Sequence, residues 1–185
     1  MRRKFLLLMV LALVVHAFAS HFVVSAGLCL AEVQGWNLSA GFLDRRFSVE
    51  TGLTFDVGGI FGGSQFDMYS FEVLAKVGLY SFESFSLGPM VSATLGNFTT
   101  GESTPTWSAN VGAGVFVDYV FENLEFSVGM MYPFLKGFDV VESIYVAANF
   151  FLTPPEGKRF TDRFFVGMDL LNGRFRWRFG FVETF

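Results

Sequence analysis

The sequence predicts an all-β protein, a closed antiparallel up-and-down barrel of about ten strands. Three observations predict it. Beyond residue 19, apolar and polar residues alternate with a period of two, which is the signature of strands with one apolar face. Short breaks rich in turn-forming residues separate about ten such segments. Hydrophobic residues make up 52% of the 185 residues. Beyond residue 19, however, no apolar run approaches the roughly 18 residues that a membrane-spanning helix needs.

Residues 1–19 are predicted to be a secretory signal peptide, and residues 20–185 a single barrel domain. Arg2, Arg3 and Lys4 precede an apolar run over Phe5 to Val15, and Ala17 to Ala19 offers an A-x-A cleavage site. Cleavage after Ala31 is the alternative. It would leave nine strands, or eight if two segments merge.

The first five predicted strands cover roughly 20–31, 36–43, 46–57, 66–80 and 85–98. The breaks "VQG", "DRR", "GGIFGGSQ" and "SFES" separate them. The first strand is needed to make an even count. In the third, "FSVETGLTFDV", Phe47, Val49 and Leu53 oppose Ser48 and Glu50.

The last five predicted strands cover roughly 107–121, 124–134, 140–152, 159–171 and 174–185. Their breaks are "TTGESTPT", "EN", "LKGFD", "TPPEG" and "NG". "WSANVGAGVFVDYVF" at 107–121 alternates without interruption, with Gly112 and Gly114 on the face opposite Val115 and Val117. No helical period competes with this pattern anywhere beyond residue 19.

Two tight hairpins fix which residues face each other. Asn172-Gly173 predicts a two-residue type I′ turn, which places Asp169 opposite Arg176 as a pair of opposite charges. The "EN" break at 122–123 predicts a second hairpin, with Phe116 opposite Gly129. A slip of one residue in the final hairpin would turn its arginines to the apolar face.

The positions of glycine and of charged residues indicate which strand face lines the lumen and which contacts lipid. Eleven of the 20 glycines fall within strands, and all lie on the polar face, as the space inside a narrow barrel requires. The strand charges share that face, whereas the apolar face carries charge only near strand ends, as lipid contact demands. We therefore predict a transmembrane barrel with a polar lumen and a lumen charge network of Glu50, Glu72, Lys76, Asp118, Glu125, Asp169, Arg174, Arg176 and Arg178.

Aromatic residues gather towards the two ends of the predicted strands, where a membrane barrel carries its aromatic girdles. If the C-terminus lies on the periplasmic side, Trp36, Trp107 and Trp177 fall towards the outer rim. Tyr80, Tyr119 and Phe121 ring the inner rim. These six residues are the predicted membrane-interface aromatics.

These features make the chain similar to the small bacterial outer-membrane β-barrel proteins. In that family the last strand ends in Phe, with apolar residues at alternate positions before it. Trp177, Phe179, Phe181 and Phe185 match that ending, and Glu183 departs from it. The resemblance implies export to the bacterial outer membrane, contact with outer-membrane lipid and recognition of the last strand by the barrel-insertion machinery. It specifies a location and a fold, not an activity.

Catalytic, metal and nucleic-acid functions find little support in the residues. His16 would leave with the signal, so His21 stands without a Ser–Asp constellation, and Cys29 is the one cysteine. We therefore expect no enzyme, although an outer-membrane barrel enzyme remains the least favoured alternative. We also expect no metal, no cofactor and no nucleic-acid partner, given a formal net charge of −4.

The arginine ladder at 174, 176 and 178 has two interpretations. It could be a positive stripe in a porin-like pore that passes a small solute, or an internal salt-bridge network that fills a narrow barrel. About ten strands leave little lumen, so we favour the network, with a structural or narrow-passage transport role. Bulky lumen residues support a plug, or alternatively line a pathway for a small apolar ligand: Phe66, Met68, Leu74, Met90, Phe116, Met131, Tyr145 and Phe165. A soluble periplasmic ligand-binding β-barrel is the rival from another class.

Overall fold

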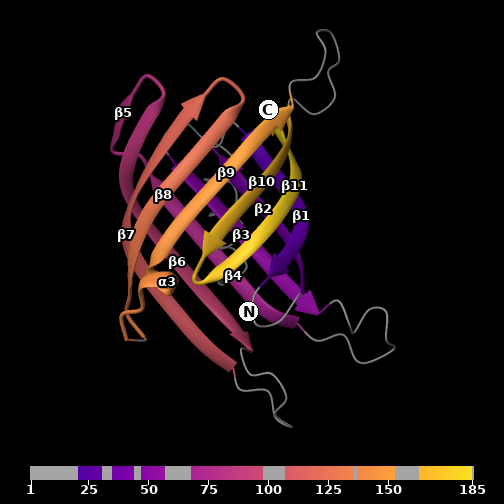
Figure 1. Ribbon diagram of the computed structural model, residues 1–185, viewed down its shortest axis with the longest axis vertical. Coiled ribbons are helices and arrows are strands. Elements are labelled where there is room, and N and C mark those ends of the chain that lie inside the picture. The colour runs from indigo at the N-terminus through magenta and orange to yellow at the C-terminus, as the bar shows by residue number, and fades with distance from the viewer. Residues whose placement is uncertain are drawn as a thin grey trace, which may run out of the picture.

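The computed structural model is a closed antiparallel β-barrel with tilted strands (Figure 1). It describes residues 21–30, 35–43, 47–56, 68–97, 107–135, 137–152 and 163–184. The predicted signal peptide, most of the longer breaks and Phe185 lie outside these ranges.

The strands follow the predicted segments closely, because each segment alternates with a period of two. They are β1 (His21–Leu30), β2 (Gly35–Leu43), β3 (Phe47–Asp56), β4 (Met68–Val77), β5 (Tyr80–Phe82), β6 (Phe85–Asn97), β7 (Trp107–Phe121), β8 (Leu124–Pro133), β9 (Ile144–Leu152), β10 (Arg163–Leu171) and β11 (Arg174–Thr184). One short helix, α3 (Val140–Ser143), lies between β8 and β9.

Apart from β4 and β5, strands that are neighbours in the chain pair with each other, and two further pairings close the cylinder. β1 pairs with β11 over ten residue pairs, from His21 opposite Thr184 to Leu30 opposite Phe175. β4 pairs with β6 across the short β5. The result is a closed barrel of ten spanning strands in up-and-down order, as the sequence predicts.

The predicted strand at 66–80 is wrong in one respect, because it does not run unbroken to Tyr80. Lys76 faces Met90, whereas Tyr80 faces Leu87, so β4 and β5 together carry one residue more than β6 between these pairs. That extra residue is a β-bulge near Gly78, and it separates β4 from β5. At the bulge, the backbone N–H of Leu79 donates to the carbonyl of Leu87 at 3.0 Å.

The two predicted hairpins have the predicted registers. Asn172 and Gly173 have φ of 52° and 73°, as a type I′ turn requires, and Asp169 faces Arg176. Phe116 faces Gly129 across the other hairpin, where Glu122 has φ of 49°. The register prediction is confirmed at both hairpins, so the side chains of β11 point as expected.

The predicted strand at 140–152 begins four residues too early. Residues 140–143 form α3, because Asp139 caps it: its carboxylate accepts hydrogen bonds from the backbone N–H groups of Val141 and Glu142 at 2.8 and 3.0 Å. Asp139 with Glu142 three residues later is a capping-box pattern, a local helix-start signal that the period-two analysis passed over.

The barrel is apolar outside and largely polar inside. Leu38 and Val115 on the outer surface are 48% and 60% exposed, whereas Arg176 and Asp169 in the lumen are 3% and 2% exposed. No helix in the described part of the chain is long and apolar enough to cross a membrane. The buried core therefore consists of the side chains that fill the lumen.

Candidate functional site

The lumen is the candidate site, and Arg176 lies at the centre of its charged part. Arg176 extends from β11 and donates from Nη1 to Glu72 on β4 at 2.7 Å, and from Nε to Asp169 on β10 at 2.6 Å. All three side chains are nearly fully buried. The guanidinium therefore bridges strands that do not touch each other in the sheet, across the interior.

Arg174 and Arg178 extend this bridge towards the two ends of the barrel. Arg174 donates to Glu72 at 2.9 Å and to the hydroxyl of Ser70 at 2.6 Å. Arg178 pairs with Glu50 through Nη1, and its Nε lies 2.9 Å from Oδ2 of Asp169. The charge side of the lumen, as we name it, comprises Glu50, Glu72, Asp169, Arg174, Arg176 and Arg178.

Lys76 forms a separate charged group on β4. Its ammonium donates to both carboxylate oxygens of Asp118 at 3.0 Å and to the hydroxyl of Ser127 at 3.2 Å. It also lies 5.1 Å from the ring centroid of Phe116 and 5.6 Å from that of Tyr145, within cation–π range. Four side chains from three other strands therefore hold this one ammonium in place.

Glu125 is joined to the network through an amide. It accepts a hydrogen bond from Nδ2 of Asn149 at 3.2 Å, and Oδ1 of the same amide accepts from Arg178 at 3.3 Å. The structure thus brings together all nine residues of the predicted charge network, in two groups rather than one. Asp118 and Lys76 form the second group.

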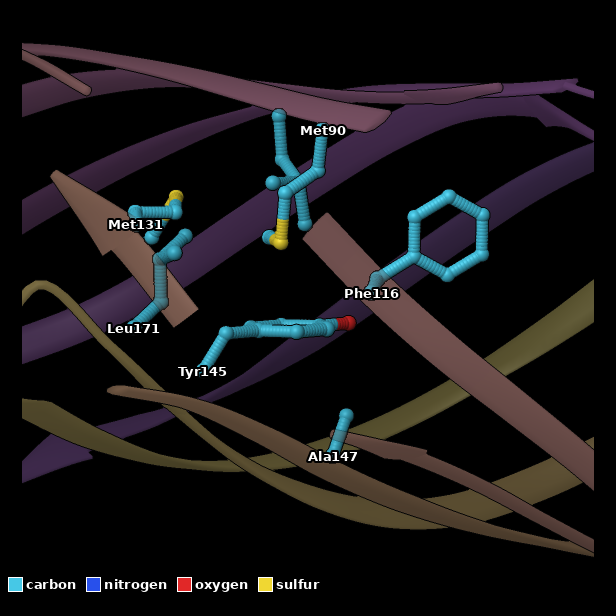
Figure 2. Close-up of a cluster of buried hydrophobic side chains, with 7 residues drawn as sticks. Met90, Phe116, Met131, Tyr145, Ala147 and Leu171 are labelled. Carbon is cyan, nitrogen blue, oxygen red and sulfur yellow. The ribbon is translucent and has the colours of Figure 1, made fainter. Parts of the chain in front are cut away.

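Another part of the lumen is filled by an apolar cluster (Figure 2). Two of its residues come from β9, and β4, β6, β7, β8 and β10 contribute one each. Met90 is 1% exposed, and Gly129 leaves room for it: a Cβ at Gly129 would lie 2.6 Å from the Met90 sulfur. The apolar cluster consists of Leu74, Met90, Phe116, Met131, Tyr145, Ala147 and Leu171.

A smaller apolar group covers the lumen near the end at which β11 finishes. Val23, Phe165 and Val182 are buried together there, with Leu43 and Phe151 packed against them. The Phe165 ring lies over Gly180, where a Cβ would approach the ring to 2.6 Å. The guanidinium carbon of Arg178 lies 5.8 Å from the same ring centroid, so this group borders the charge side.

Two small cavities lie between these groups. Among the described residues, one cavity of about 40 Å³ lies between Lys76, Glu125, Tyr145 and Arg178. A second of about 10 Å³ lies against Glu72 and Arg176. A cavity of this kind needs about 10–15 Å³ to hold one water molecule, so these spaces suit a few waters and no larger solute.

Five of the six predicted girdle aromatics lie on the outer surface towards the ends of the strands, and the side chain of Trp107 is outside the described ones. Tyr80, Tyr119 and Phe121 are 60%, 43% and 55% exposed, at the end with the Glu122–Asn123 turn. Trp36 and Trp177 both face Leu28 in the register, in the half of the barrel near the Asn172–Gly173 turn. Trp107 is the first residue of β7 at that same end.

The final strand separates its two faces as the sequence predicts. Trp177 and Phe179 are 39% and 59% exposed on the outer surface, and Phe181 stacks edge-on with Phe164 at 6.3 Å between ring centroids. Glu183 is exposed near the end of β11. Phe185 lies outside the described residues.

Sequence reasoning missed the small polar side chains that complete the network. Ser25 and Ser39 share a hydrogen bond of 2.6 Å, and Asn37 donates to the hydroxyl of Thr54 at 3.0 Å. Their period-two positions indicate that they face the lumen, but the network was predicted from charged residues alone. In the described ranges, no group of three or more His, Cys, Asp or Glu side chains could hold a metal ion.

Comparison with known proteins gives one weak likeness. No protein-family model matches the chain, and no curated protein matches it. A crystal structure of Neisserial surface protein A (NspA) is 14% identical, with 89% of this chain and 95% of that chain covered and a TM-score of 0.30.

Proposed function

We propose that this protein is an integral outer-membrane β-barrel with a side-chain-filled lumen, and that its role is structural. One observation carries the proposal: the barrel is inverted relative to a soluble one. Every spanning strand exposes at least one large hydrophobic side chain on the outer surface, in order along the chain Leu28, Leu38, Leu53, Phe71, Val91, Val115, Val128, Phe150, Val166 and Phe179.

Exposure of this apolar belt is unfavourable in water and favourable in lipid. Soluble monomers rarely expose a contiguous apolar patch larger than a few hundred Å², whereas this one passes around the whole barrel. Lipid also accepts the closed sheet, because the backbone hydrogen bonds of the spanning strands are made between neighbouring strands. A soluble periplasmic ligand-binding barrel would need the reverse arrangement, with the apolar face inside.

The way in which the chain reaches the membrane belongs to the same proposal. Residues 1–19 would direct export, and Trp177, Phe179, Phe181 and Phe185 would present the last strand to the barrel-insertion machinery. We place the C-terminus on the periplasmic side, because two turns at that end have only two residues, Glu83–Ser84 and Glu122–Asn123.

A narrow-passage transport role is the second candidate, and the two cavities favour it. Both are lined by Glu50 and Leu74, so they lie next to each other along the charge side. Only water or a small ion would fit, and the bridge from Arg176 to Glu72 and Asp169 would have to open. We propose the filled, structural lumen first, because both carboxylates hold that guanidinium closely.

Cell fractionation with a heat-modifiability gel tests the membrane location. We expect the wild-type protein in the outer-membrane fraction, and an unheated band that migrates apart from the heated one. Val128→Arg should lower the folded fraction, since Arg near the bilayer midplane costs about 2–4 kcal/mol. The matched control is Ser84→Arg in the exposed β5–β6 turn, which should change little. Release of the wild-type protein in the soluble fraction would overturn the proposal.

A further inference from the structure

The connection between β8 and β9 is unusually apolar for a loop at the mouth of a barrel. Beyond Tyr132 it exposes Phe134, Leu135, Phe138, Val140 and Val141, each between 51% and 61%. Loops that face water are normally polar. The connection lies at the same end of the barrel as the β10–β11 turn (Figure 1), which is the outer end in the proposed orientation.

Two aromatic contacts hold this connection against the outer face of β8. The Phe138 ring stacks on Tyr132 at 6.3 Å between centroids, with 21° between the ring planes. Phe134 meets the same Tyr132 edge-on at 6.0 Å, and its backbone N–H donates to the carbonyl of Val111 at 2.7 Å. The apolar side chains therefore continue the outer surface of the sheet.

The helix α3 lies against the β10–β11 turn. Cγ of Glu142 and Cγ1 of Val141 lie 3.5 and 3.9 Å from the position of a Cβ on Gly173 in that turn, and Ser143 is fully buried. Val140 and Val141 are more than half exposed on the helix. Asp139 satisfies backbone donors at the start of the helix, which is a condition for a segment that leaves water.

We propose that the β8–β9 connection inserts into lipid at the outer membrane interface and contacts the upper parts of the acyl chains. This inference rests on the proposed membrane location. Exposed apolar side chains extend from Val128 and Met130 on β8, through Tyr132 and Phe134, to the two valines of α3, with the exposed Asp139 just before them. Their position next to the belt selects lipid as the occupant.

Environment-sensitive dyes on single cysteines test the insertion. Cys29 is replaced by Ser, and the dye is attached at Phe138→Cys or Val141→Cys. Belt and water controls carry it at Val128→Cys and Glu122→Cys. Each protein is refolded into phosphatidylcholine vesicles with bromine atoms placed either high or deep on the acyl chains, and folding is checked by heat-modifiability.

We expect blue-shifted emission at positions 138 and 141 relative to position 122, with stronger quenching by the high bromines. Position 128 should be quenched more by the deep bromines. Water-like, unquenched emission at 138 and 141 beside quenching at 128 would overturn the insertion alone. Absence of quenching at 128 would overturn the membrane location. A blue shift that disappears on dilution of protein into excess lipid would indicate a second copy, and would also overturn the insertion.

Discussion

One part of the lumen is filled by paired charges, and another by a cluster of aliphatic, aromatic and sulfur-containing side chains. On the charge side, Arg176 makes two short hydrogen bonds to carboxylates from different strands. In the apolar cluster, Met90 and Met131 are 1% and 2% exposed and make no hydrogen bond that defines their position. The same ten strands thus support two kinds of packing within one interior.

The two kinds of packing are stable under different conditions. Buried charges are tolerated because each has an opposite charge, so the loss of one partner leaves an uncompensated ion. Apolar side chains need only matched volume, so the loss of atoms costs according to the cavity left behind. The charge side specifies which strands come together, and the apolar cluster fills the space between them. Substitutions that remove a charge and substitutions that remove only volume should therefore change the free energy of unfolding in different ways.

Arg176→Met should cause the largest loss of stability, because it removes the cation that Glu72 and Asp169 share. We expect a loss of about 3–5 kcal/mol in the free energy of unfolding, measured by urea titration in lipid vesicles. Arg176→Lys keeps the charge without the fork-shaped donor group, and should lose less. Equal losses in the two variants would show that the charge itself does not matter.

Met131→Ala tests the apolar cluster, and the neighbouring Met130 gives a matched control. Met131 is 2% exposed in the lumen, whereas Met130 is 54% exposed on the outer surface. Met131→Ala should cost about 2–5 kcal/mol in the same titration, since the lumen cannot collapse around the cavity. Met130→Ala should cost clearly less. The reverse order would contradict the assignment of the two faces.

Two glycine substitutions compare how tightly the two sides are packed. A Cβ at Gly129 would lie 2.6 Å from the Met90 sulfur and 2.8 Å from a backbone oxygen, so Gly129→Ala should cost about 1–3 kcal/mol. A Cβ at Gly52, beside Arg176, would meet nothing closer than 3.4 Å. Gly52→Ala should therefore stay within about 0.5 kcal/mol of wild type. Similar losses at both positions would show that packing does not differ between the sides.

A double substitution asks whether a charge pair can become apolar. Lys76→Met alone leaves the partly buried Asp118 beside Ser127 without its cation and should destabilise the barrel. Adding Asp118→Leu should restore stability, with a coupling energy of about 0.5–3 kcal/mol between the two sites. Purely additive losses in the double-mutant cycle would mean that the ion pair at 3.0 Å contributes nothing specific.

Much of the architecture could be predicted from the sequence, because a strand has one short period and a hairpin has a fixed register. Asp169 opposite Arg176 follows from Asn172-Gly173 alone. The partners that reach across the interior could not be predicted, since Glu72 and Arg176 lie on strands that never pair. The bulge near Gly78 and the helix at 140–143 also escaped, because both interrupt the alternation on which the prediction rests.

Planar-bilayer conductance tests the central claim, a filled lumen inside a membrane-spanning barrel, most directly. The purified wild-type protein, inserted and shown to be folded by heat-modifiability, should give no stable single-channel steps. The two cavities near Arg176 and Arg178 hold a few waters at most. Stable steps in the wild-type protein that disappear in Arg176→Ala would contradict the account, because they would make the arginine ladder part of an open anion pathway.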